Sequence, residues 1–239
     1  SSRGARVVLA GRDTDALALA ADAVDAKFFQ CDASDFSQMK DCIETVRGIH
    51  GRIDGVANCV GSILLKPAHL TTADEWSALL AVNLTAAFAT VKYAARAMMG
   101  QGGSIALVSS CAARVGIPDH DAIAAAKAGV EGLVRSAAAT YARHQIRVNC
   151  VAPGLLRTNM SNELTSNKAQ LQASLEMHAL GRIGTAADVA VVMDWLLGDD
   201  SSWVTGQSIA VDGGLSSVRS RRAHRQLDPR AACSSNDTK

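Results

Sequence analysis

The chain alternates between short apolar runs and longer segments with helical spacing, and this pattern limits the folds it can adopt. Strands with one wet face alternate apolar and polar side chains, whereas these runs are nearly continuous. We therefore expect a parallel sheet covered by helices on both faces. The predicted strands are residues 5–12, 27–32, 53–62, 102–113, 146–154 and 206–214. The predicted helices are residues 13–24, 34–51, 72–100, 120–144, 166–180 and 185–198.

Length and composition favour one α/β domain. The chain has 239 residues, 48% of them hydrophobic, which is enough to bury a core and excludes general disorder. We expect this domain over residues 1–215. Residues 216–239 are rich in arginine and predict a disordered tail, with an arm on a neighbouring subunit or an anionic surface as the alternative.

Charge and cysteine usage narrow the partners and the compartment. The net charge of +1 favours no nucleic-acid partner. No apolar run of about 18 residues was found, so no membrane partner is expected. The six cysteines form no CxxC pair, which indicates buried free thiols and no metal site. A reducing compartment is predicted, the cytoplasm or an organelle matrix, and an N-terminal targeting segment before Ser1 is left open.

Small or polar residues follow each of the first five predicted strands. In a doubly wound sheet, ligands bind beyond the carboxyl ends of the strands. Any one of these strand ends is a weak signal, but five together predict a ligand site along one rim. In chain order these strand ends carry Gly11, Arg12 and Asp13; Cys31, Asp32 and Ala33; Asn58 and Gly61; Ser109 and Ser110; and Pro153, Gly154 and Thr158.

Several motifs make the chain resemble the classical short-chain dehydrogenases/reductases over residues 4–215. They are ANCVG (57–61), Asn83, the serine of LVSS, Lys127 in KAG, IRVNCVAPG with Thr158, LGRIGTAADVA (180–190) and WVTGQSIAVDGG (203–214). The resemblance implies a Rossmann-type doubly wound sheet. It also implies an NAD(P)-dependent oxidoreductase that reduces a carbonyl or oxidises a secondary alcohol.

The resemblance assigns the adenosine half of the cofactor to the first three strand ends. Asp32 and Ala33 would flank the adenine, while Asn58 and Gly61 would line the adenosine and ribose side. Arg12 follows the strand after which NAD-preferring members often carry an acidic residue. Because a guanidinium pairs well with a 2′-phosphate, NADP is favoured over NAD. The alternative for Arg12 is a solvated loop arginine.

The nicotinamide half would be held by residues from the later strand ends. Lys127 would bind the hydroxyls of the nicotinamide ribose. The nicotinamide itself would be positioned by Pro153, Gly154 and Thr158. His178 lies either near the helix that would cover the substrate or simply on the surface.

The residues for chemistry include one departure from the family. Reduction of a carbonyl builds negative charge on oxygen, which needs a hydrogen-bond donor and a proton. By resemblance Ser110 would donate the hydrogen bond, and Asn83 would help hold a proton-relay water. The family's proton donor is a tyrosine four residues before the lysine, where this chain has Ile123. His120 is a candidate replacement, against a plain role at the start of the helix.

A second departure concerns the start of the pattern. The family's first strand and its glycine-rich turn have no counterpart in this sequence. That strand is central in the topology, and each unsatisfied buried backbone group costs about 1–3 kcal/mol. We therefore expect a fragment of a longer product, with a strand supplied by another chain as the alternative.

Two classes of function remain open at this stage. One is an NADP-preferring enzyme with an atypical proton donor, and the other is a catalytically impaired scaffold or nucleotide-sensing subunit. A homo-oligomer through helices 72–100 and 120–144 is expected, since Ala124, Ala128 and Gly132 would allow helices to approach closely. The alternative is that these small residues pack on the chain's own sheet.

Overall fold

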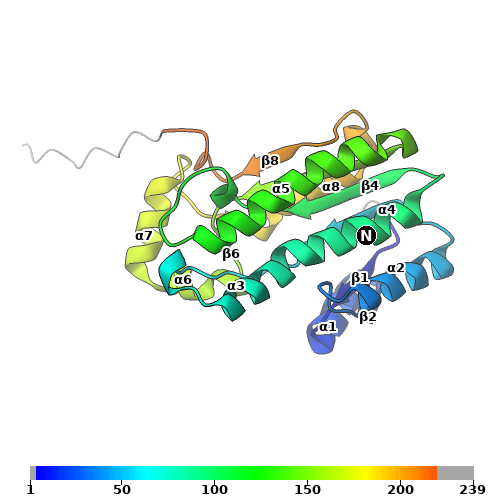
Figure 1. Ribbon diagram of the computed structural model, residues 1–239, viewed down its shortest axis with the longest axis horizontal. Coiled ribbons are helices and arrows are strands. Elements are labelled where there is room, and N and C mark those ends of the chain that lie inside the picture. The colour runs from blue at the N-terminus through cyan, green and yellow to red at the C-terminus, as the bar shows by residue number, and fades with distance from the viewer. Residues whose placement is uncertain (1–3, 220–239) are drawn as a thin grey trace, which may run out of the picture.

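A parallel four-stranded sheet forms the centre of the molecule, of which the computed structural model describes residues 4–219 (Figure 1). Its strand order is β3-β4-β5-β8. The strands are β3 (Gly55–Asn58), β4 (Gly103–Val108), β5 (Ile146–Pro153) and β8 (Ser208–Val211). The pairing of Gly103 with Ile146 and of Val108 with Val151 sets the register of the two central strands.

Helices cover both faces of this sheet, as the continuous apolar runs predicted. Ile105 and Leu107 belong to the core beneath α4 (Ala86–Met98) and α5 (Asp121–Tyr141). Ala106 points to the opposite face and packs with residues of α8 (Ala186–Leu197). Successive strand side chains alternate between faces, so this split places α8 opposite the pair α4 and α5.

A second sheet contains β1 (Val8–Gly11) and β2 (Lys27–Gln30), which are parallel and pair only with each other. Helix α1 (Thr14–Val24) packs on these strands, and α2 (Phe36–His50) packs against α4 (Figure 1). Asp13 and Asp35 cap the two helices through their carboxylates. Among the described residues, the β1-β2 sheet has no pairing with the four-stranded sheet, and a strand that would join the two remains a prediction.

The predicted helix 72–100 is interrupted. It comprises α3 (Ala73–Leu80), a π-helical turn (Ala81–Thr85) and α4. A capping box of Thr72 and Glu75 starts it. The span Ala73–Met98 is long and apolar enough to cross a membrane by composition, contrary to the sequence-based expectation; half of its most apolar window is buried in the protein, as in a core helix.

The segment between β5 and α8 also differs from the prediction. Residues 166–180 were expected to form one helix, but the structure has α6 (Asn162–Ser166) and α7 (Lys168–Met177). A two-stranded sheet of β6 (Leu156–Arg157) and β7 (Gly184–Thr185) was not anticipated, because two-residue strands leave no periodic pattern.

The cysteines are only partly buried. Cys31, Cys111 and Cys150 are buried free thiols as expected, whereas Cys42 is half-buried and Cys59 is exposed. No group of three metal-ligating side chains occurs within residues 4–219. Cys233 and residues 220–239 of the predicted tail lie outside the described part of the chain.

Candidate functional site

Lys127 lies where the carboxyl end of β4 meets α5. Its side chain is 6% exposed, and Nζ donates a hydrogen bond of 3.0 Å to the carbonyl of Val108, the last residue of β4. Burial lowers the pKa of Lys127 from 10.5 to about 8, since the charged form loses hydration. At neutral pH Lys127 is therefore protonated, but it releases its proton more readily than an exposed lysine does.

Asn83 reaches the same place from the π-helical turn. It is 2% exposed, and its amide donates to the carbonyl and hydroxyl of Ser62 and to the carbonyl of Leu79. Its Oδ1 accepts the Ser62 amide at 3.3 Å. Asn83 thus holds the loop that follows β3. The π turn widens the helix at this residue, a feature often found at functional sites.

Gly61 lies between these two side chains. A Cβ at this position would lie 3.1 Å from Asn83 Oδ1 and 3.5 Å from Lys127 Nζ. The carboxamide and the ammonium group therefore converge on the same stretch of bare backbone. The structure brings together three residues that the sequence had placed on separate elements.

Ser110 occupies the rim directly after this point. It has an extended backbone, and its Oγ accepts the amide of Ala112 at 3.2 Å, which starts a short 3₁₀ turn. The neighbouring Ser109 is buried and bonds the carbonyl of Lys127, which ties the end of β4 to α5. The hydrogen bond from Ser109 therefore holds the backbone next to Ser110 against the backbone of Lys127.

A buried carboxylate reinforces this connection, and no sequence motif pointed to it. Glu131 lies one turn after Lys127 and is 9% exposed. Its Oε1 accepts bonds from Ser109 Oγ, Arg114 Nε and Ser208 Oγ. Because the three donors come from different segments, only the folded chain assembles the network. It fixes α5 against the ends of the strands.

Ile123 lies one turn before Lys127 and faces an apolar environment. It is 6% exposed and forms a small cluster with Leu79, Ala122 and the half-buried Leu64. No hydroxyl from these residues stands in for a tyrosine. His120 is the N-cap residue of α5, and its Nδ1 donates to the carbonyl of Pro118 at 2.7 Å.

Two residues of the predicted adenosine side, Asn58 and Ala33, are buried in the protein. Asn58 is buried; its amide donates to the carbonyl of Ala86 and the hydroxyl of Thr90, and its Oδ1 accepts the amide of Val60. This side chain therefore fastens β3 to α4. Ala33 is buried at the start of the loop after β2.

Arg12 and Asp32 face each other across the ends of β1 and β2. Their closest charged atoms are 4.0 Å apart, and the Arg12 side chain is 70% exposed, so the pair is loose. Asp32 accepts the amide and hydroxyl of Ser34, and these bonds lower its carboxyl pKa. The guanidinium remains open to a ligand, whereas the carboxylate is engaged in its own turn.

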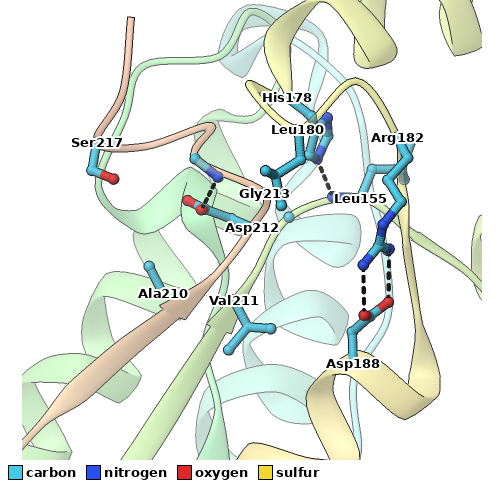
Figure 2. Close-up of a pocket in the computed structure, with 13 residues that line it drawn as sticks. Leu155, His178, Leu180, Arg182, Asp188, Ala210, Val211, Asp212, Gly213 and Ser217 are labelled. Carbon is cyan, nitrogen blue, oxygen red and sulfur yellow. Dashed lines mark hydrogen bonds and ion pairs between the residues drawn. The ribbon is translucent and has the colours of Figure 1, made fainter. Parts of the chain in front are cut away.

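The end of β5 carries the residues that were assigned to the nicotinamide side, and that assignment remains a prediction. Pro153 is the last residue of β5, and the amide of Gly154 bonds the carbonyl of Val211 at 3.2 Å. Thr158 and Ser161 form a capping box that starts the next 3₁₀ turn. Figure 2 shows the pocket beside this turn, in which the His178 ring points toward Leu155. His178 is 2% exposed, so the surface placement considered for it is wrong.

Comparisons with known proteins identify the family to which the chain belongs. The family described as "Enoyl-(Acyl carrier protein) reductase" matches residues 1–216. The 2,5-dichloro-2,5-cyclohexadiene-1,4-diol dehydrogenase of Sphingobium indicum is 34% identical over 224 residues, covering 90% of this chain and 88% of the relative.

Two solved structures share the fold at similar coverage. A short-chain type dehydrogenase/reductase from Mycobacterium ulcerans has a TM-score of 0.86 and 31% identity, over 89% of this chain and 81% of the other. A gluconate 5-dehydrogenase from Burkholderia cenocepacia, in complex with NADP and tartrate, has a TM-score of 0.87 and 27% identity, over 91% and 88% of the two chains. The chain therefore belongs to the classical short-chain dehydrogenase/reductase family of oxidoreductases.

Proposed function

We propose that the protein is an NADP-preferring oxidoreductase that transfers hydride between the nicotinamide and a small carbonyl compound or secondary alcohol. The observation that carries this proposal is the convergence of Lys127 and Asn83 on Gly61, with Ser110 on the same rim. A bound nicotinamide cofactor would supply the hydride. Lys127 would donate hydrogen bonds to ribose hydroxyls, and Ser110 would donate to the substrate oxygen as negative charge develops there.

Ile123 stands where the family has its proton donor, and this favours a second candidate function. Ile123 packs among apolar side chains and has no proton to give. A chain with this substitution could bind the nucleotide without turning it over, as a sensing subunit or a scaffold. The first candidate needs another proton donor, either His120 or a water molecule.

Titration with NADPH, followed through nucleotide fluorescence, separates these functions when it is combined with a panel of carbonyl substrates. Binding with consumption of NADPH supports the oxidoreductase. Binding without consumption supports the sensor. Absence of NADPH and NADH binding, even after the missing N-terminal segment is restored, would overturn the oxidoreductase and the sensor and leave the scaffold.

Arg12 is expected to carry the preference for NADP. Replacing it with alanine removes a charge-assisted bond to the 2′-phosphate, so the dissociation constant for NADPH should rise about tenfold or more while that for NADH changes little. Both constants are measured by fluorescence titration. Arg52→Ala is a matched control, because Arg52 pairs with Asp54 before β3, at the amino end of the sheet. Equal weakening of NADPH and NADH would contradict the assignment.

A homo-oligomer through α4 and α5 is part of the proposal. The face that includes Ala128 is available, since Ala128 is exposed and Ala124 and Gly132 are half-buried. We expect Ala128→Arg to shift the protein to a smaller species in size-exclusion chromatography with light scattering, because a guanidinium prevents close helix approach. Ala23→Arg, at an exposed position of α1, should leave the mass unchanged. An unchanged mass for Ala128→Arg would exclude this face.

A further inference from the structure

His178 is a buried imidazole whose two ring nitrogens are both engaged by backbone groups. Nδ1 lies 2.6 Å from the carbonyl of Ser174, and Nε2 lies 3.2 Å from the amide of Leu155. A carbonyl only accepts, so Nδ1 carries the proton. The amide only donates, so Nε2 is unprotonated. The tautomer with its proton on Nδ1 therefore satisfies both partners.

These two bonds join segments that are distant in the sequence. His178 is the C-cap of α7, whereas Leu155 follows β5 and lies 23 residues earlier. The ring also borders the end of β8, because a Cβ on Gly213 would lie 3.4 Å from its Cδ2. One side chain thus contacts the segments after β5, after α7 and after β8.

The contact with the turn after β5 is close. A Cβ on Gly154 would lie 2.6 Å from His178 Nε2 and 3.0 Å from the Cα of Asp212. The backbone at Gly154 is therefore pressed between the imidazole and the residue that follows β8. A cavity of about 390 Å³ opens beside this contact, and Figure 2 shows His178 and Leu155 on its wall.

The charged groups around the cavity have hydrogen-bond partners other than the ring. Arg182 donates two bonds to Asp188, at 2.9 and 2.8 Å. Asp212 accepts the amides of Gly214 and Ser216, each at 2.9 Å. Among the bonds found in the described residues, the ring nitrogen is the acceptor of the Leu155 amide.

We infer that His178 is a positioning residue, which holds the Gly154–Leu155 turn in the conformation that presents the nicotinamide side of the site. This rests on the proposed function, in which the turn after β5 borders the nicotinamide. In this role the imidazole acts through the Leu155 amide rather than on the reacting atoms. Its effect should therefore be on cofactor affinity and KM rather than on the chemical step.

The test compares His178→Leu, which removes both bonds, with His178→Gln, whose carboxamide can still accept one and donate the other. Hydrogen exchange at the Leu155 amide, followed by NMR, reports the turn without any ligand. NADPH titration and steady-state kinetics report the site. His144→Leu is the matched control, because His144 lies before the opposite end of β5.

We expect Leu155 exchange about tenfold faster and NADPH binding about tenfold weaker in His178→Leu, since a buried donor loses its acceptor. His178→Gln should stay within about threefold of the wild type for both, and kcat should change less than KM. If His178→Leu does not fold, the glutamine variant decides: a loss of NADPH affinity with Leu155 exchange unchanged overturns the inference.

Other outcomes distinguish the two proposals. Leu155 exchange that is unaffected by His178→Leu overturns the positioning role, whatever the cofactor result. Exchange that rises while NADPH affinity stays at the wild-type value shows that the turn does not serve the cofactor, which also overturns it. A wild type that binds no NADPH refutes the proposed function, and the exchange measurement then still decides whether His178 holds the turn.

Discussion

Replacing Ile123 with tyrosine is expected to raise NADPH-dependent carbonyl reduction by about 10²–10⁴-fold, the range over which a positioned general acid accelerates a reaction. Residues four apart share one face of a helix, so a tyrosine at 123 would lie beside Lys127. The nearby ammonium group would stabilise the phenolate and make the hydroxyl a better proton donor. The measurement is the initial rate of NADPH oxidation over a panel of ketones and aldehydes.

The expected gain in rate requires that a tyrosine side chain fit among the residues packed around Ile123. The isoleucine is buried against Leu79 and Leu64, and overpacking such a cluster costs about 1–3 kcal/mol. Ile123→Tyr combined with Leu64→Ala provides room for the ring, and Leu64→Ala alone is the matched control. A thermal melt confirms folding of each variant. A folded, NADPH-binding double variant whose rate stays at background would show that the remaining site is not competent.

Lys127→Met is expected to make the protein more stable and unable to bind NADPH. Burial lowers the pKa of Lys127 from 10.5 to about 8, which corresponds to a penalty of about 3 kcal/mol on the charged side chain at neutral pH. Methionine removes that penalty but leaves the carbonyl of Val108 without its donor, so the net gain should be about 1–2 kcal/mol. The ribose hydroxyls lose their ligand at the same time.

The pH dependence of unfolding tests the sign of this effect. Below pH 8 both folded and unfolded wild type hold the proton, so the penalty is fully present. Between pH 8 and 10.5 the folded protein releases its proton first, and the free energy of unfolding rises relative to Lys127→Met. Denaturant titrations at pH 7 and pH 10 measure it, with Lys27→Met at an exposed position as the control. If the difference in free energy of unfolding between the wild type and Lys127→Met stayed constant from pH 7 to pH 10, the lowered pKa of Lys127 would be contradicted.

Much of the fold was predictable because its signals are local. The apolar runs of β4 and β5 predicted a sheet covered on both faces, and the separate cores above and below Ile105 and Ala106 confirm it. The features that the sequence missed depend on contacts rather than on pattern. The π turn around Asn83 and the two-residue strands β6 and β7 have no periodicity of their own.

The candidate site divides in the same way. Lys127, Asn83, Ser110 and Gly154 were singled out from motifs, and the structure places the first three around one rim. The sequence did not predict the hydrogen bonds of Glu131 and His178, because their partners come from other segments of the chain. The sequence around Glu131 does not predict Ser208 as a partner, because the hydrogen bond joins residues 77 positions apart.

By itself, the sequence determined the alternation of strands and helices and the residue types available at the strand ends, because both are written in local spacing and side-chain chemistry. Only the tertiary structure decided that Gly61 separates Asn83 from Lys127, that Lys127 is desolvated enough to lower its pKa, and that His178 bonds Leu155. Burial and hydrogen bonding depend on distances between segments far apart in the chain, and these distances exist only once the sheet and its helices have packed.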